Sequence, residues 1–94
     1  MRLLDDNAIR AELEKLTGWQ RQDNAIAKTY EYKDFAAALS FVNHVGGLAE
    51  SVNHHPDIDI RWNKVTLVLF THYLGGLTEK DFQLAARIES TLAT

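Results

Sequence analysis

Three segments of the chain repeat their apolar residues every three or four positions, which is the period of an amphipathic helix. The first helix is expected to begin at caps offered by Asp5–Asn7 and to end at Thr17-Gly18, because glycine readily takes the positive φ of a helix C-terminus. The second is expected to begin at Asp34 and to end at Pro56, because the residue before a proline is disfavoured in the α region. The third opens at Thr78–Asp81, which has the form of a capping box. The apolar positions of the three helical faces are Ile9, Leu13 and Leu16; Ala38, Phe41, Val45, Leu48 and Val52; and Leu84, Ala85, Ile88 and Leu92.

Four further segments favour β-strands. Residues 57–62 alternate cleanly, so the isoleucines and Trp62 are expected to face inward and the charged residues outward. Val65–Phe70 is mostly apolar on both faces, the pattern of a central strand, and a turn at Asn63-Lys64 would precede it. A tight turn at residues 23 and 24 joins the remaining two strands, Trp19–Gln22 and Ala25–Tyr32.

The element order is therefore α-β-β-α-β-β-α within one domain spanning residues 1–94. A four-stranded antiparallel sheet with the three helices on one face is the economical arrangement, which is an α+β fold. A chain of this length buries only about two-thirds of its unfolded surface, so self-association through the open face would help. Gly46 and Gly47 each weaken the second helix by about 1 kcal/mol relative to alanine, and a close packing contact is expected to explain them.

The composition excludes several kinds of chemistry. The chain has a formal charge of −3 with interleaved acids and bases, so it offers no basic stripe for nucleic acid. It has no cysteine, which excludes disulfides, thiolate metal ligands and a cysteine nucleophile, and which fits a reducing compartment. The N-terminus turns acidic at once, and no apolar run approaches the roughly 20 residues that span a bilayer. We therefore expect a cytoplasmic protein that binds neither nucleic acid nor membrane.

Three of the four histidines fall where the predicted strands end. His54 and His55 follow the second helix directly, and His72 comes just after the central strand. Antiparallel pairing of the last two strands should bring these ends together, so the imidazoles are expected to share one rim of the sheet. Glu50 lies four residues before His54, where a persisting helix would make them neighbours and let the carboxylate hold one imidazole tautomer. His44 shows no such pattern and is expected to be structural or exposed.

The pattern Glu50-x-x-x-His54-His55-Pro56, followed by Trp62, His72 and Asp81, resembles the signature of the pterin-4a-carbinolamine dehydratases. The similarity covers nearly the whole chain, and its supporting segments are Gly18-Trp19, Asp34-Phe35, Asn63-Lys64-Val65, Thr71-His72 and Gly76-Leu77-Thr78. The resemblance implies dehydration of 4a-hydroxytetrahydrobiopterin to quinonoid dihydrobiopterin, a step that recycles the cofactor of aromatic amino acid hydroxylases. It also implies a homodimer or homotetramer that needs no metal and no cofactor.

The chemistry of this reaction suits imidazole. Hydroxide leaves C4a poorly unless it is protonated, and the proton on N5 must be removed. Imidazole can do both, because its unperturbed pKa of about 6.5 lies near the working pH. The resemblance implies that His54 and His72 transfer protons, that His55 chiefly binds, and that Glu50 supports His54. Asp81 is expected to be structural, in the reciprocating position of the capping box. The residues expected to surround the pterin are His54, His55, Pro56, Thr71, His72, Trp62 and Trp19.

Two other functions use the same residues. Three histidines could bind a catalytic zinc, although adjacent histidines on an irregular turn seldom point the same way. Alternatively the chain could be a non-catalytic dimerisation or adaptor module, because some members of the family resemble adaptors that bind a transcription factor's dimerisation helix. The second helix could then supply the interface. The complete histidine set would serve no purpose in a pure adaptor, so we expect an enzyme.

Overall fold

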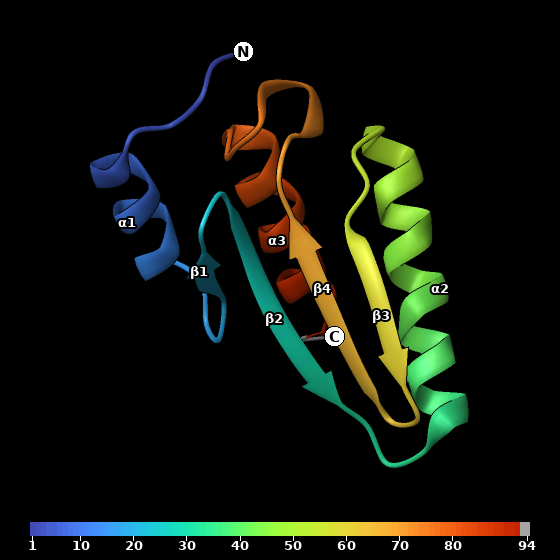
Figure 1. Cartoon of the computed structure of the whole chain (residues 1–94). Coiled ribbons are helices and arrows are strands. Elements are labelled where there is room, and N and C mark those ends of the chain that lie inside the picture. The colour runs from blue at the N-terminus through green and yellow to red at the C-terminus, as the bar shows by residue number, and fades with distance from the viewer. Residues whose placement is uncertain (93–94) are drawn as a thin grey trace.

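The computed structural model describes residues 1–92, which form three helices and a four-stranded sheet in the expected order (Figure 1). Helix α1 begins at its N-cap Asp5, and helix α2 begins after Asp34, whose side chain accepts a hydrogen bond from the Ala37 amide. A short 3-10 helix, His72–Leu74, precedes the last helix. The elements are α1 Asp6–Glu14, β1 Gln20–Gln22, β2 Ala25–Glu31, α2 Phe35–Val52, β3 Asp57–Arg61, β4 Lys64–Leu69 and α3 Glu79–Leu92.

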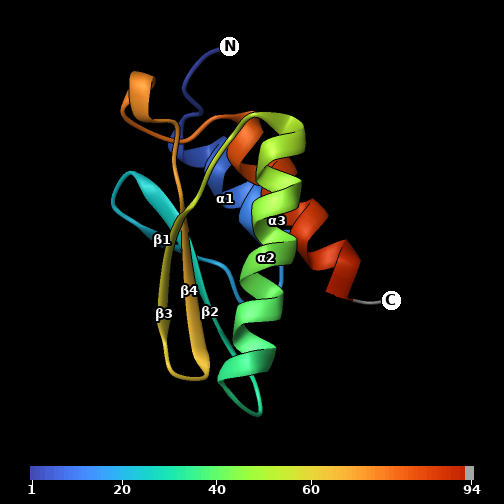
Figure 2. The same cartoon turned by 90° about the vertical axis from the view of Figure 1, so that its right-hand side faces the viewer.

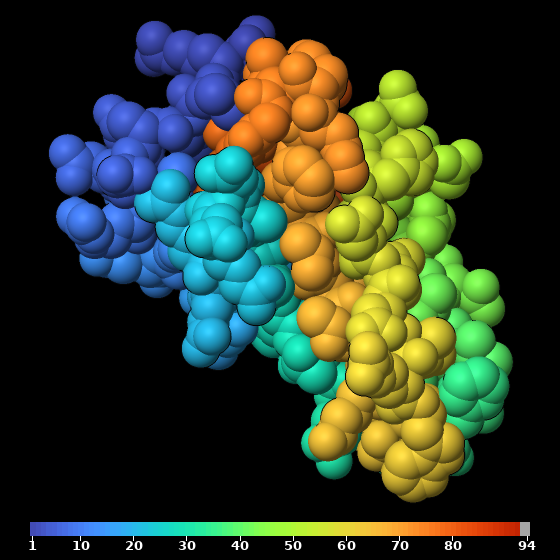
Figure 3. All heavy atoms as spheres, in the orientation of Figure 1, coloured from blue at the N-terminus to red at the C-terminus, as the bar shows by residue number. Residues whose placement is uncertain are grey.

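The four strands form one antiparallel sheet in the order β1-β2-β4-β3, so β4 is central, as its apolar sequence predicts. All three helices cover the same face of this sheet (Figure 2). The opposite face carries no helix, and the side chains of the strands form its surface (Figure 3). The predicted α+β fold is therefore confirmed.

The core lies between the helices and the alternate strand residues that face them. In β4 these are Val65, Leu67 and Leu69, all fully buried, and the register pairs Leu69 with the buried Ile26 of β2. Fully burying one such side chain stabilises the fold by about 1.5–3 kcal/mol. The central strand is therefore held firmly, and so are the segments that join it at each end. The helices contribute Ile9; Ala38, Phe41, Val45 and Ala49; and Phe82, Leu84, Ala85 and Ile88.

Two helices end earlier than predicted. Helix α2 ends at Val52, because Asn53 takes the left-handed conformation with φ of 52° and ψ of 45° and caps the helix. Asparagine tolerates this conformation better than most residues, so the stop signal is Asn53 and the expectation for Pro56 was wrong. Helix α1 likewise ends at Glu14 and not at Thr17-Gly18.

Trp62 does not face the core, which corrects the expectation from strand alternation. Arg61 pairs with Lys64, so Trp62 and Asn63 form a two-residue hairpin loop in place of the predicted turn at Asn63-Lys64. Trp62 has φ of 51° and is 67% exposed. Tight hairpin loops need positive φ to match strand twist, and that demand takes Trp62 out of the alternating pattern. Asn63 anchors the loop by donating its side-chain amide to the Tyr32 carbonyl at 2.8 Å.

Other expected apolar positions are less buried than their spacing predicts. Ile58 lies on the edge strand β3 and is 39% exposed, and Leu92 at the end of α3 is 42% exposed. A Cβ atom built on Gly46 or Gly47 would meet no atom of the described chain within 4 Å. The close contact expected there is therefore absent from residues 1–92. No helix in this range has the length and apolar character needed to cross a membrane.

Candidate active site

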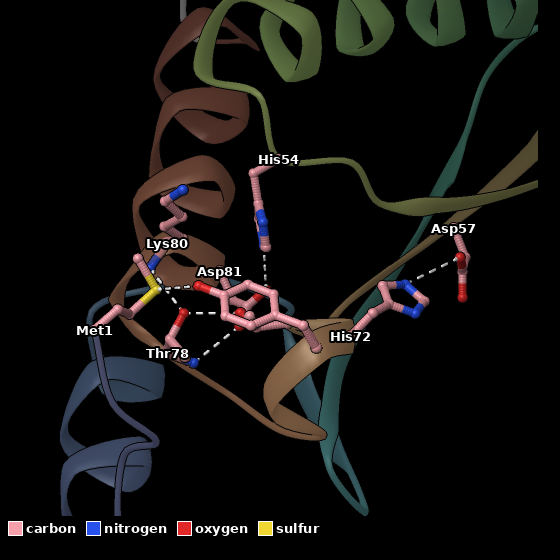
Figure 4. Close-up of polar contacts among 9 residues, drawn as sticks. Met1, His54, Asp57, His72, Thr78, Lys80 and Asp81 are labelled. Atoms are coloured by element: carbon pink, nitrogen blue, oxygen red, sulfur yellow. Dashed lines mark hydrogen bonds and ion pairs between the residues drawn. The ribbon is translucent and has the colours of Figure 1, made fainter.

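The candidate site lies at one end of the β3–β4 hairpin. Because Asp57 pairs with Val68, the segment before β3 and the segment after β4 leave the sheet side by side. The first segment carries His54 and His55, and the second carries His72. The start of α3 lies next to them and brings Asp81 into the same region (Figure 4). The pairing of β3 with β4 thus brings the segments that carry the histidines to one end of the sheet, as the sequence predicted.

Asp81 is the fully buried centre of a hydrogen-bond network. Its Oδ2 accepts the backbone N–H of Thr78 at 2.9 Å and the hydroxyl of Thr71 at 3.0 Å. Thr78 Oγ1 in turn accepts the Lys80 amide at 3.3 Å, and the two threonine hydroxyls are 2.8 Å apart. Asp81 and both threonines are at most 1% exposed. Asp81 therefore has the helix-capping role predicted for it, and its other oxygen remains for a further partner.

That further partner is His54. Its Nε2 lies 2.6 Å from Asp81 Oδ1, and the imidazole side chain is only 11% exposed (Figure 4). An ionised carboxylate can only accept, so the network assigns the proton to Nε2 and leaves Nδ1 as the unprotonated nitrogen of the neutral ring. Among residues 1–92, Nδ1 has no hydrogen-bond partner. In that tautomer Nδ1 is an acceptor.

Glu50 contacts His55 and not His54, which corrects the sequence-based pairing. The distance from Glu50 Oε2 to His55 Nε2 is 2.5 Å. The expected contact with His54 assumed that the helix continued, whereas α2 ends at Val52 and Asn53 turns the chain. Both members of the Glu50–His55 pair are exposed, with side-chain accessibilities of 78% and 53%.

His72 begins the 3-10 helix that follows β4. Its ring packs against the Phe70 ring with centroids 4.0 Å apart. Its Nε2 is 4.0 Å from Asp57 Oδ1, and both side chains are 63% exposed (Figure 4). Asp57 was predicted to be a solvated strand residue, and the signal that could have found this contact is its position at the start of β3. Each of the three imidazoles therefore has its own carboxylate.

A cavity of about 420 Å³ lies between the end of α2 and the face of α3. Its lining residues are Val52, His54, Lys80, Gln83, Leu84, Ala86 and Arg87. Of the three candidate imidazoles, only His54 lines it. The described chain therefore brings the three histidines to one end of the sheet without gathering them in one cavity. No three His, Asp or Glu side chains within residues 1–92 come together in the manner of a metal site.

The remaining candidates lie in different surroundings. Pro56 is half-buried in the same segment as the histidines, and Thr71 belongs to the Asp81 network. Trp62 lies at the opposite end of the hairpin from the histidines, because the five-residue strand β3 separates it from them by about 16 Å. Trp19 is a buried core residue whose indole donates to Glu89 at 3.3 Å. The structure therefore separates both tryptophans from His54 within one chain.

Glu89 forms a second polar cluster, beneath the sheet. Its Oε2 accepts hydrogen bonds from Lys28 at 2.8 Å and from the Tyr30 hydroxyl at 2.5 Å. Burial acts to raise the pKa of Glu89, but the hydrogen bonds from Lys28 and Tyr30 outweigh it and the net pKa is lowered. Burial, followed by the hydrogen bond to Glu89, raises the pKa of the Tyr30 phenol strongly. Glu89, Lys28 and Tyr30 are not among the residues that line the cavity that contains His54.

The α+β fold and the histidine–carboxylate contacts can be set beside those of known proteins. Residues 2–91 match the family described as pterin 4 alpha carbinolamine dehydratase. A protein of Roseiflexus castenholzii named "Putative pterin-4-alpha-carbinolamine dehydratase" is 56% identical over 90 residues, covering 96% of this chain and 97% of the relative. The chain belongs to the pterin-4a-carbinolamine dehydratase family.

Two solved structures share the fold. The transcriptional coactivator/pterin dehydratase of Brucella melitensis is 32% identical with a TM-score of 0.90, over 95% of this chain and 97% of that one. A pterin dehydratase-like protein identified as a RuBisCO assembly factor in the alpha-carboxysome is 22% identical with a TM-score of 0.62, over 77% and 83%. The second likeness concerns the fold alone.

Proposed function

We propose that this chain is a dehydratase that removes water from a 4a-hydroxytetrahydropterin, the family's example being 4a-hydroxytetrahydrobiopterin. The C4a–O bond breaks, the hydroxyl leaves as water after protonation, and the N5 proton is lost as the N5=C4a bond forms. The product is the quinonoid dihydropterin. In the cell this step would return the cofactor of aromatic amino acid hydroxylases to its reducible form.

In this proposal His54 is the general base and accepts the N5 proton at Nδ1. Asp81 is a positioning residue, because its carboxylate keeps the proton on His54 Nε2 and fixes the plane of the ring. From the family resemblance we assign protonation of the leaving hydroxyl to His72 and substrate binding to His55, which is held by Glu50, although neither ring lines the cavity beside His54 within one chain. Positioned acids and bases of this kind typically contribute about 10²–10⁴-fold each.

One observation carries the proposal above the others. A buried carboxylate orients an imidazole that forms part of the wall of a cavity, and the cavity volume of about 420 Å³ is within the range of small-molecule sites. The family of the chain supplies the substrate class. Either fact alone would be weaker, because buried histidine–carboxylate pairs also occur for structural reasons.

The proposal is tested with a 4a-hydroxytetrahydropterin generated in the assay and the rate of its dehydration followed by stopped-flow absorbance. We expect the purified protein to accelerate dehydration and His54→Ala to lower kcat by about 100-fold. His44→Ala is the matched control, because His44 lies on the exposed face of α2 and contacts Thr91 at 2.8 Å, away from the cavity. Equal rates for both variants would remove His54 from the mechanism, and no acceleration by the wild-type protein would refute the proposed reaction.

A second candidate function is an adaptor that binds another protein through α2. Phe35 and Leu39 lie on this helix and are 45% and 41% exposed, and the Brucella melitensis relative carries the name coactivator. The same surface would serve a homodimer or homotetramer, which we expect in solution. Light scattering tests the assembly: a monomer at micromolar concentration would contradict it. A pure adaptor would keep its partner contact and lack dehydratase activity.

A further inference from the structure

The cavity beside His54 is cationic although the chain as a whole is acidic. Its lining residues include Lys80 and Arg87 and no aspartate or glutamate. The neighbouring hollow between α1 and α3, by contrast, is lined by Glu12 and Glu79. The charge of the His54 cavity is therefore local, and the formal charge of −3 does not predict it.

The two cations bracket the cavity along one face of α3. Lys80 immediately precedes Asp81 and so lies at the end of the cavity near His54 (Figure 4). Arg87 follows seven residues later, which is two helical turns and about 10 Å along the axis. Leu84 and the α2 residue Val52 give the space between them an apolar wall. The cavity thus has one cation, Lys80, beside His54 and a second, Arg87, at its far end.

Neither cation is neutralised by the protein. Of the ten Lys and Arg side chains, four form an ion pair with a carboxylate within residues 1–92, namely Lys15, Arg21, Lys28 and Arg61, and Lys80 and Arg87 are among the six that do not. Two unpaired cations over an apolar wall suit a flat ligand that carries a negative charge at its far end, and the planar guanidinium matches carboxylate and phosphate in particular.

We propose that the substrate of this protein is a pterin whose side chain carries an anionic group, a carboxylate or a phosphate, held by Arg87 at the far end of the cavity. This inference rests on the proposed function, because it assumes that the ring lies beside His54. It deepens that function by naming the class of pterin that the cavity selects.

The test compares binding of three fluorescent oxidised pterins by titration at low ionic strength. The probes are pterin-6-carboxylate, the phosphate monoester of 6-hydroxymethylpterin, and neutral 6-hydroxymethylpterin. We expect at least one anionic probe to bind about tenfold more tightly than the neutral probe, and the preference to shrink as salt rises, because Arg87 is exposed. The tighter of the two anionic probes identifies which anion the cavity takes.

Three variants make the result specific. Arg87→Gln should reduce the preference to about twofold or less, and Arg87→Glu should invert it. Arg10→Gln, which removes the same charge from an exposed position on α1, should leave the preference unchanged. Equal binding of all three probes by the wild-type protein, or an undiminished preference in Arg87→Gln, would overturn the inference.

The dehydration assay with a neutral substrate separates this inference from the proposed function. Dehydration of a neutral 4a-hydroxytetrahydropterin by the wild-type protein tests the proposed function alone, because that substrate carries no anionic group for Arg87 to hold. A wild-type protein that prefers the anionic probes but dehydrates no pterin would refute the proposed function and still support a cavity that selects anions.

Discussion

The Asp81→Asn substitution separates the structural role of Asp81 from its effect on His54. In the wild-type protein, Oδ2 accepts two hydrogen bonds from Thr71 and Thr78, and Oδ1 faces His54 Nε2. An asparagine can place its carbonyl oxygen where Oδ2 lies and keep both threonine contacts. Its NH₂ group then faces His54 and must donate. Nε2 becomes the acceptor, and the ring proton moves to Nδ1.

The structure gives the magnitudes of the two effects. Asp81→Ala would leave the buried donors of Thr71 and Thr78 without their acceptor, and at about 1–3 kcal/mol each the loss of stability is about 2–6 kcal/mol. Asp81→Asn keeps these bonds and only exchanges a charge-assisted contact for a neutral one, which costs about 1 kcal/mol. Its catalytic cost is larger, because a protonated Nδ1 cannot accept the N5 proton. We expect kcat to fall by about 100-fold or more.

Urea denaturation followed by far-UV circular dichroism measures the stability of both variants, and stopped-flow dehydration measures their turnover. Nitrogen NMR of the histidine rings reports which nitrogen of His54 carries the proton. A folded Asp81→Asn protein with its proton on Nδ1 and wild-type turnover would refute the reasoning, because the tautomer would then have no part in the reaction. Asp81→Ala serves as the comparison, since it should lose stability as well as activity.

Two further predictions concern stability. Because the pKa of Tyr30 is raised in the folded protein, the contribution of Tyr30 to the free energy of unfolding is complete below the unfolded pKa of 10.0 and is lost as pH rises above that value. The free energy of unfolding should therefore fall between about pH 10 and 12 in the wild-type protein and fall less in Tyr30→Phe. Equal slopes for the two proteins would contradict this. Gly47→Ala should raise the free energy of unfolding by about 0.5–1 kcal/mol, because the added methyl group meets open space and alanine favours a helix interior over glycine. If the variant is instead less stable at a protein concentration where the chain self-associates, a second copy contacts this position.

The fold was predictable because its signals are local. The apolar spacing of α2 and the apolar run of β4 specify those elements without knowledge of the rest of the chain. Two of the errors lie where a single residue adopts a positive φ. Asn53 and Trp62 both do so, and in each case a periodic pattern that continues through the sequence is interrupted in the structure. Alternation alone cannot reveal such a break, because it depends on turn geometry.

The site was only partly predictable for a related reason. The sequence indicated that His54, His55 and His72 would come to one end of the sheet, since strand pairing determines that. It could not indicate which carboxylate each ring would contact, because Asp81 is 27 residues from His54 and Glu50 is oriented by the end of the helix. Lys80 and Arg87 carry no signal in the sequence beyond their charge, and only the packing of α3 against the end of α2 places them on one cavity.

Asn53 has an effect that reaches beyond the end of its own helix. By turning the backbone just before the two histidines, it directs His54 inward to a buried acid while His55 meets water and a surface acid. Two chemically identical neighbours thereby acquire independent environments. Selection could alter the surface ring, for affinity or for a different ligand, without disturbing the interior ring that is proposed to move the proton.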